Sequence, residues 1–340
     1  MKRFIRYILS IILLVFVFIS GWYAAQHFTK VETKDIPTPF VEKLRPLEKY
    51  TIANLSKNKN VSAQIDIGET LAEEDEYTSY SFSMKFDPTF SEGKQKSVTG
   101  VLNIPTDTEK APLVVMIRGF VSQEIYTPGM GTKNAAAYFA ENGYITIAPD
   151  FLGFGDSDSE SSNIFETRFQ TYTTMVALLN SLDEIEQWDN EHKFIWAHSN
   201  GGQIALTASV ILEHDIPTTL WAPVTKPFPF SILYYTDEAP DEGKYLRTTL
   251  AKFEEDYDVD NFNFTNHLEE ISSPIQIHQG TADDAIPVEW SRSFVAKMER
   301  IEKEIELYTY SGADHNLRPS WDAVVERDVT FFNSFLDSKE

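Results

Sequence analysis

Cysteine is absent from the 340 residues of this chain. Its absence excludes a disulfide framework, a thiolate nucleophile and any zinc or iron–sulfur site that depends on cysteine ligands. Basic residues are also scarce, since 29 lysines and arginines stand against 52 acids and give a formal net charge of -23. Because a surface of that sign repels phosphate backbones, the sequence argues against a nucleic-acid partner.

The first 26 residues form a segment of their own, a membrane anchor or a signal segment. A short basic flank, MKRFIR, precedes uncharged and mostly apolar residues from Tyr7 to Ala25. As a helix this run spans about 28 Å, close to the ~30 Å thickness of the hydrocarbon core. An uncleaved single-pass anchor places the basic flank in the cytoplasm and the remaining chain outside it. Signal cleavage, the alternative, gives a secreted protein.

The rest of the chain divides into a tether and one large domain. Residues 27–49 contain Pro37, Pro39 and Pro46 among charged residues and are expected to be a tether. Residues 50–340 are expected to form the folded domain, because 42% of the chain is hydrophobic and can supply one large core.

Short apolar runs alternate with helical periodicity after residue 112. The runs are too short for core helices and too uniformly apolar for a one-faced sheet, so they predict parallel strands covered on both faces. The fold class is therefore α/β, an open doubly wound sheet preceded by two or more antiparallel strands. The expected strands are 113–117, 144–148, 193–197, 218–222, 275–278 and 305–310. The expected helices are 133–142, 164–188, 200–212, 287–302 and 320–337.

One long interval, at about 223–270, interrupts this alternation between two core strands. Such a length exceeds an ordinary strand-to-helix connection. Sites in doubly wound sheets lie at the carboxyl ends of the strands, which is where this insertion begins. We expect it to form a cap.

The stretch FIWAHSNGG (194–202) contains the first candidate catalytic residue, Ser199. A serine in a strained strand-to-helix elbow needs small residues two positions before and after it. Ala197 and Gly201 meet that need, although Ala197 replaces the glycine of the usual G-x-S-x-G pattern. An ordinary serine N-cap is the alternative interpretation.

A serine nucleophile requires a base, and the base requires an orienting acid. His315 follows the last expected strand, and Asp283 follows the strand before it. The chain order serine, aspartate, histidine is that of α/β-hydrolases. Asp284 is the alternative acid, because the spacing barely separates the two neighbours.

The oxyanion formed by serine attack needs two N–H donors. Asn200, directly after the nucleophile, and Phe120, in the RGF turn after an earlier strand, are the candidates. Arg118 in the same turn is expected to make a structural salt bridge, with a substrate carboxylate as its alternative partner. This chemistry requires no cofactor or metal.

Several other polar residues favour structural interpretations. Asp150 and Asp156 are expected to hold the loop after a core strand, and His198 and His278 to pack or hydrogen-bond beside the motifs. The run DYDVDN (256–261) begins like a calcium loop but lacks its glycine and its final glutamate.

Residues 95–340 resemble the α/β-hydrolase superfamily, and within it the catalytic domain of the prolyl oligopeptidase family and dienelactone-hydrolase-like serine hydrolases. The matching pieces are VVMIRGF, YITIAPDFLGFGDS, AHSNGG, GTADDAIP and GADHN. The resemblance implies Ser199 as nucleophile, Asp283 as acid and His315 as base.

The resemblance also implies a serine-type peptidase that cleaves a peptide or other small substrate through an acyl-enzyme. A carboxylesterase acting on small acyl or carbohydrate esters is the alternative. A non-catalytic binding protein on the same fold is a third interpretation, because fold alone does not establish chemistry. The sequence makes no prediction about oligomeric state.

Overall fold

The computed structural model describes residues 2–28, 43–91, 93–106 and 108–336. The chain divides into two compact units, Met1–Leu44 and Arg45–Glu340, and each is described by itself.

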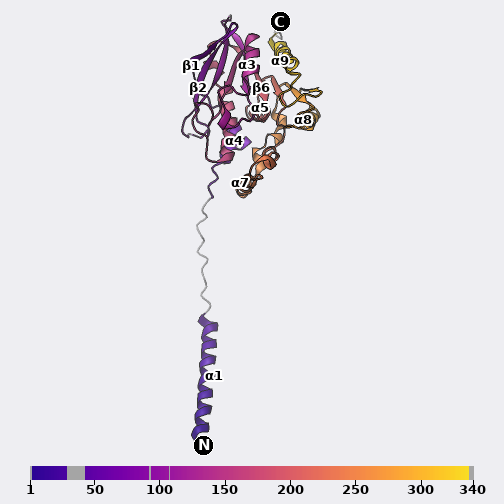
Figure 1. Ribbon diagram of the computed structural model, residues 1–340. Helices are drawn as coiled ribbons and strands as arrows, with labels where there is room; N and C mark the ends of the chain where they lie inside the picture. Colours follow the sequence, from indigo (N-terminus) through magenta and orange to yellow (C-terminus); the bar gives the residue numbers. More distant parts are fainter. Residues whose placement is uncertain (1, 29–42, 92, 107, 337–340) are drawn as a thin grey trace. The chain divides into compact units, whose positions relative to one another are not determined.

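Helix α1 (Lys2–Phe28) is the helix of the first unit (Figure 1). Within the described residues, no helix combines the length and the apolar character needed to cross a membrane. The anchor expected over residues 1–26 is therefore not confirmed and stays a prediction. Most of the expected tether, residues 29–42, lies outside the described residues.

The second unit begins at Arg45, earlier than the expected start at residue 50. Leu47 is 4% exposed, and its main-chain N–H donates to the Tyr257 hydroxyl at 3.0 Å. The 3-10 turn η1 (Glu48–Tyr50) leads into helix α2 (Ile52–Lys57). The last residues assigned to the tether therefore fold onto the domain, because Leu47 and Tyr50 bury apolar surface there.

One nine-stranded sheet organises the described part of this unit, in the order β1-β2-β3-β5-β4-β6-β7-β8-β9. The first three strands pair antiparallel and β3 pairs antiparallel with β5, whereas β5, β4, β6, β7, β8 and β9 run parallel. This confirms a mostly parallel α/β sheet with antiparallel leading strands. The strands are β1 (Gln64–Glu73), β2 (Tyr77–Phe86), β3 (Lys96–Pro105), β4 (Ala111–Ile117), β5 (Ile145–Pro149), β6 (Trp188–His198), β7 (Thr218–Trp221), β8 (Ile275–Gly280) and β9 (Ile305–Tyr310).

Helices cover both faces of this sheet, because successive side chains of its central strands point in opposite directions. In β4, Leu113, Val115 and Ile117 join the core shared with α4, α5 and α8, whereas Val114 and Met116 join the core shared with α3 and α9. Both sets are fully buried. Figure 1 shows the helices around the sheet. They are α3 (Lys133–Glu141), α4 (Ile164–Leu179), α5 (Asn200–Leu212), α8 (Val288–Arg300) and α9 (Trp321–Leu336).

Helix α4 ends at Leu179, nine residues before the end that the sequence predicted. The Asn180 carboxamide donates hydrogen bonds to the carbonyl oxygens of Lys59 (2.6 Å) and Val61 (2.9 Å). These partners lie about 120 positions earlier in the chain, so the helical periodicity of residues 164–188 does not reveal this stop.

The insertion between β7 and β8 is helical and packs on α4. It contains α6 (Phe230–Leu233), α7 (Lys244–Glu254) and four short 3-10 turns, which are η4 (Thr236–Glu238), η5 (Val259–Phe262), η6 (Phe264–Asn266) and η7 (Leu268–Glu270). The Phe262 ring stacks on Phe169 of α4 at 4.9 Å between centroids, and Phe253 lies 5.1 Å from Phe165. Aromatic packing therefore fixes this insertion to the helix that borders the site described below.

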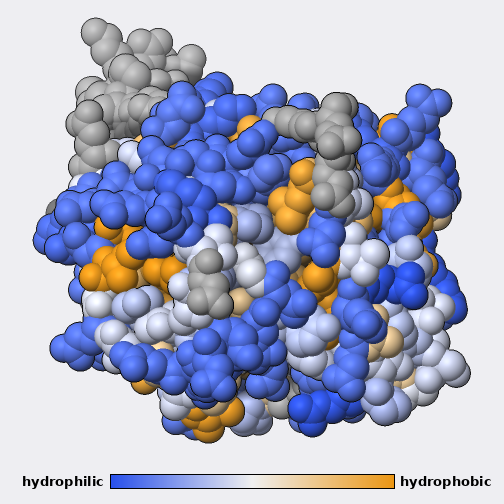
Figure 2. Space-filling view, turned by 90° about the horizontal axis from the view of Figure 1, so that it is seen from above, coloured by the Kyte–Doolittle hydropathy of each residue, from blue (hydrophilic) through white to orange (hydrophobic). Residues whose placement is uncertain are grey.

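The face seen from above is dominated by hydrophilic residues, and its hydrophobic residues form small, separate patches (Figure 2). This agrees with the large acidic excess of the sequence.

Candidate active site

Ser199 lies in the sharp turn between β6 and α5, with φ 56° and ψ -121°. A positive φ is costly for a residue with a side chain and persists only where the surroundings enforce it. The Ser199 N–H donates to the Trp221 carbonyl at 2.9 Å, and its own carbonyl accepts from Val224 at 2.9 Å. A Cβ added at Gly201 would lie 2.3 Å from the Ile117 carbonyl oxygen, so this position requires glycine.

His315 and Asp283 meet at the carboxyl edge of the sheet, as the sequence predicted. His315 Nδ1 lies 3.1 Å from Asp283 Oδ1 and 3.0 Å from Oδ2. The Asp283 side chain is fully buried, whereas 20% of the His315 side chain is exposed. The arrangement leaves the outer edge of the imidazole accessible.

The Asp283 carboxylate is held ionised by its hydrogen bonds. Burial alone raises its pKa, but the hydrogen bonds from His315 and from the Ile286 and Ala285 amides outweigh that effect and leave the pKa below its ordinary value. The two amides donate to Oδ1 at 2.8 and 2.9 Å, and Gln279 Nε2 donates to Oδ2 at 2.8 Å.

Asp284, the alternative acid, is exposed and makes no side-chain hydrogen bond within the described part of the chain. The geometry therefore favours Asp283 as the partner of His315.

The His315 loop lies against the residue that precedes Ser199. His198 Nε2 lies 2.9 Å from the His315 carbonyl oxygen, and the two rings are 4.7 Å apart. Desolvation, followed by the neighbouring His315, lowers the pKa of His198 to about 4, so His198 stays neutral near pH 7. Ser199 and His315 form no hydrogen bond with each other in the described structure. Such contacts are often long before substrate binds.

Phe120 follows a glycine that lies directly beside Ser199. A Cβ added at Gly119 would come within 2.9 Å of Ser199 Cβ and 3.4 Å of Ser199 Oγ. Asn200 is the first residue of α5, so its N–H belongs to the open first turn of that helix. The Phe120 and Asn200 main chains therefore flank Ser199.

The salt bridge expected for Arg118 was wrong, because Arg118 makes no ion pair within the described part of the chain. Its guanidinium is buried and donates from Nη1 to the Gly119 carbonyl at 3.0 Å and from Nη2 to the Asp150 carbonyl at 2.8 Å. The rings of Phe154 and Tyr126 lie 4.1 and 4.7 Å from its central carbon. Main-chain carbonyls and aromatic faces take the place of the expected carboxylate.

Of the residues assigned to structural roles, Asp150, His198 and His278 make such contacts. Asp156 is exposed and makes no side-chain hydrogen bond in the described part of the chain. The buried Asp150 carboxylate accepts from Thr99 at 2.7 Å and from Tyr126. His278 lies between Tyr310 and Asp328, at 2.8 and 2.9 Å. Asp328 is fully buried and was not anticipated from the sequence.

A cavity of about 480 Å³ opens beside Phe120 and Asn200. The loops after β4 and β5 and the helices α4 and α5 line it. Its polar lining includes charged side chains of both signs and one buried amide: Arg118, Arg168, Glu124, Glu160 and Gln170. A volume of this size suits a small molecule. Arg168 and Gln170 were not anticipated, because polar residues within a helix carry no local signal of a cavity.

Comparison with known proteins assigns the chain to a family. Residues 131–339 match the model of the prolyl oligopeptidase family, and the chain belongs to that family. Together with the α/β-hydrolase fold, this makes the protein a serine hydrolase.

Solved structures show the same fold. Acetyl xylan esterase 1 from Thermoanaerobacterium sp. JW/SL YS485 matches with a TM-score of 0.61 and 12% identity, over 84% of this chain and 93% of the esterase. A puromycin-hydrolysing peptidase of Mycobacterium tuberculosis matches with a TM-score of 0.52 and 14% identity, over 80% of this chain and 40% of the peptidase.

An uncharacterised 31.7 kDa protein of Escherichia coli, encoded in the traX-finO intergenic region, is 28% identical over 107 residues. The match covers 31% of this chain and 35% of that protein, so it spans about a third of the relative.

Proposed function

We propose that the protein is a carboxylester hydrolase that uses Ser199, His315 and Asp283. In this proposal Ser199 Oγ attacks the ester carbonyl while His315 accepts its proton, and the buried Asp283 orients the imidazole. The alcohol leaves with a proton from His315, and water then releases the acid from the acyl-enzyme. The cavity of about 480 Å³ beside the turn that contains Ser199 supports a small ester as the substrate.

The first test compares esters with peptides. We expect para-nitrophenyl acetate to be hydrolysed with a larger rate enhancement over the uncatalysed reaction than a tetrapeptide amide bond. The leaving group of a peptide is an amine, which must be protonated before it departs. A peptide also extends on both sides of its scissile bond, so it needs more room than a small ester. Initial rates for both substrates, each divided by its uncatalysed rate, provide the comparison.

A serine-type peptidase is the second candidate, because the chain belongs to the prolyl oligopeptidase family. A larger rate enhancement for the tetrapeptide than for para-nitrophenyl acetate would favour this candidate and contradict the first.

Arg118 supports the proposed oxyanion site by fixing a peptide plane. The Gly119 carbonyl and the Phe120 N–H belong to one trans peptide unit, so they point in opposite directions. The Arg118 hydrogen bond to that carbonyl holds the plane, and with it the direction of the Phe120 N–H. Polarisation of the carbonyl also makes the N–H a stronger donor.

Replacement of Arg118 by Met is expected to lower kcat about 10- to 100-fold with little change in KM, because loss of a complete oxyanion donor costs about 10²- to 10³-fold. Rates are normalised to active sites titrated with a fluorophosphonate, so unfolded protein does not contribute. Arg292→Met is the matched control, since Arg292 is an exposed arginine. A variant whose kcat equals that of the wild type would contradict this role.

The proposal extends to location, with residues 1–26 as an uncleaved anchor and the catalytic unit on the extracytoplasmic side. The basic flank and the apolar run from Tyr7 to Ala25 support it. We expect the protein to stay with membranes after alkaline carbonate extraction and to retain its N-terminal residues by mass spectrometry. Release of a chain shortened by about 25 residues would support the secreted alternative.

A further inference from the structure

A second cavity, of about 520 Å³, opens on the opposite face of the sheet from the cavity beside Phe120. Helices α4 and α5 line the first cavity, whereas Trp196 and Trp221, which line the second, belong to the core shared with α3 and α9. The loop before α3, the start of α3 and the loop after β9 complete the lining. A volume of this size suits a small molecule.

This second cavity borders the catalytic histidine. His198 lines it, and His198 Nε2 lies 2.9 Å from the His315 carbonyl oxygen. Asn316, the residue after His315, lines it too. Gly131, another lining residue, lies against Arg118 in the turn after β4, because a Cβ added at Gly131 would come within 3.2 Å of Arg118 Cβ. A ligand in this cavity therefore lies next to the loop that carries His315.

The charged groups of the second cavity have one sign. Two basic side chains, Lys133 and Arg318, line it, and no acidic side chain of the described residues does. His198 is neutral near pH 7, because burial lowers its pKa to about 4. The cavity beside Phe120, in contrast, is lined by charges of both signs. An entirely positive lining favours an anionic ligand.

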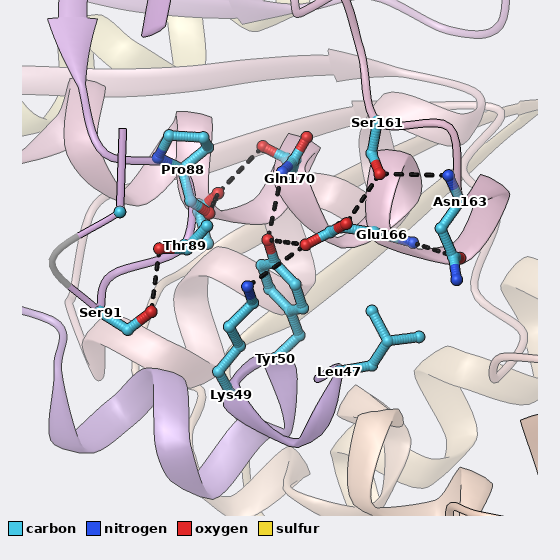
Figure 3. A network of polar contacts seen from close by, with 12 residues as sticks. Leu47, Lys49, Tyr50, Pro88, Thr89, Ser91, Ser161, Asn163, Glu166 and Gln170 are labelled. Atoms are coloured by element: carbon cyan, nitrogen blue, oxygen red, sulfur yellow. Dashed lines mark hydrogen bonds and ion pairs between the residues drawn. The ribbon is translucent and has the colours of Figure 1, made fainter. Parts of the chain in front are cut away.

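Neither basic side chain is paired with an acid of the protein itself. Other cations of the chain have such partners. Lys49, for example, lies 3.3 Å from Glu166 in a network of polar contacts (Figure 3). Lys133 and Arg318 make no ion pair and no side-chain hydrogen bond within the described part of the chain. Their donors are therefore available to a ligand.

Two acids lie close to Arg318 in the chain without occupying its guanidinium. Asp314 accepts from the main-chain N–H groups of Asn316 and Arg318, each at 2.9 Å. Asp322 lines a smaller neighbouring cavity together with Arg318. Their charges weaken the positive potential around Arg318, but neither carboxylate lines the second cavity.

The lining selects an anionic group attached to an apolar or aromatic body. The Arg318 guanidinium can donate two parallel hydrogen bonds to a carboxylate or a phosphate, and the Lys133 ammonium can add another. Trp321, partly buried beside them, contributes apolar surface. A cationic ligand would be repelled, and a neutral one would leave both positive charges without a counterion.

In the proposed reaction His315 transfers its proton to the departing alcohol, so the alcohol part of the substrate lies on the His315 side of the site. We propose that the second cavity binds an anionic group, a carboxylate or a phosphate, carried by the alcohol part of the substrate ester. This inference rests on the proposed ester hydrolase function and names the substrate class of the same site.

The test uses the full-length protein and two aryl acetates that differ in charge. The leaving group of 3-acetoxybenzoate carries a carboxylate, and that of 3-acetoxybenzamide carries a neutral amide of similar size. Each kcat/KM is divided by the rate constant for hydrolysis by hydroxide, which corrects for the different leaving groups. We expect a corrected preference of about 5- to 20-fold for the carboxylate, because an exposed ion pair contributes up to about fivefold and two cations are available. Without such a site, the net charge of -23 predicts the opposite preference.

Replacement of Arg318 or Lys133 by Gln removes one positive charge and is expected to lower this preference about two- to fivefold. Arg300→Gln is the matched control, because it changes the net charge equally at an exposed residue of α8 that does not line the cavity. Raising the ionic strength from about 0.05 to about 0.5 M should weaken the wild-type preference, since salt screens exposed charges. A wild type that prefers the amide, or a preference unchanged in both folded variants, would overturn the inference.

A second measurement does not depend on ester hydrolysis. Isothermal titration calorimetry is expected to detect binding of 3-hydroxybenzoate or phenyl phosphate to the wild type and weaker binding to Lys133→Gln. The tighter of the two ligands identifies the preferred anion. Binding of neither anion, or equal binding to both proteins, overturns the inference. If neither acetate is hydrolysed, the proposed ester hydrolysis fails, and this titration still decides whether the cavity binds anions.

Discussion

Replacement of Ser199 by Ala is expected to lower ester hydrolysis by about 10⁶-fold, the scale of nucleophile removal in a serine hydrolase with an intact triad. The substitution removes only the attacking oxygen. The proposed oxyanion amides and the cavity stay in place, so some activity above that of water alone should persist. Steady-state kinetics with para-nitrophenyl acetate measures the loss.

Folding of the Ser199→Ala variant provides the control. Alanine occupies the same turn and leaves the main-chain bonds to Trp221 and Val224 available. Its thermal midpoint should therefore lie within a few degrees of the wild type. Retention of even a hundredth of wild-type activity in the folded variant would mean that another group attacks the ester.

Asp283→Asn is expected to lower kcat by about 10⁴-fold, the effect of the same change in a serine protease triad. The asparagine carboxamide can present an N–H to His315 Nδ1 and stabilise the wrong imidazole tautomer. It also removes the negative charge that stabilises the protonated imidazole. Because the pKa of Asp283 is held below its ordinary value, the charge is present throughout the neutral range, and the effect should persist from pH 6 to 8.

Asp284→Asn is the matched control for this prediction. It makes the same change of charge one residue away, on an exposed side chain. We expect its kcat to change less than about twofold, since surface substitutions are usually nearly neutral. If the two variants lost activity equally, His315 would not depend on the Asp283 carboxylate for its orientation.

The parts of the site that could be predicted are those with a local signal. Ser199, Asp283 and His315 each follow a short apolar strand, and the carboxyl ends of parallel strands meet at one edge of a sheet. The sheet itself could be predicted for the same reason, because uniformly apolar runs separated by helical periodicity have few alternatives.

The parts that could not be predicted depend on contacts between distant segments. The sequence predicted a salt bridge between Arg118 and a carboxylate. In the fold, carbonyl oxygens and aromatic rings from later loops surround Arg118 instead. Gln170 lies in the middle of α4, and its buried, oriented amide exists only because Tyr50, 120 positions earlier, folds against it. Sequence periodicity carries no information about such pairs.

The central claim is that Ser199 is the reactive nucleophile, and covalent labelling tests it most directly. The protein is treated with a fluorophosphonate, digested, and analysed by mass spectrometry to locate the adduct. We expect a single adduct on the peptide that contains Ser199, and none after substitution of His315 by Ala. An adduct on another residue, or a folded wild-type protein that takes up no label, would contradict the account.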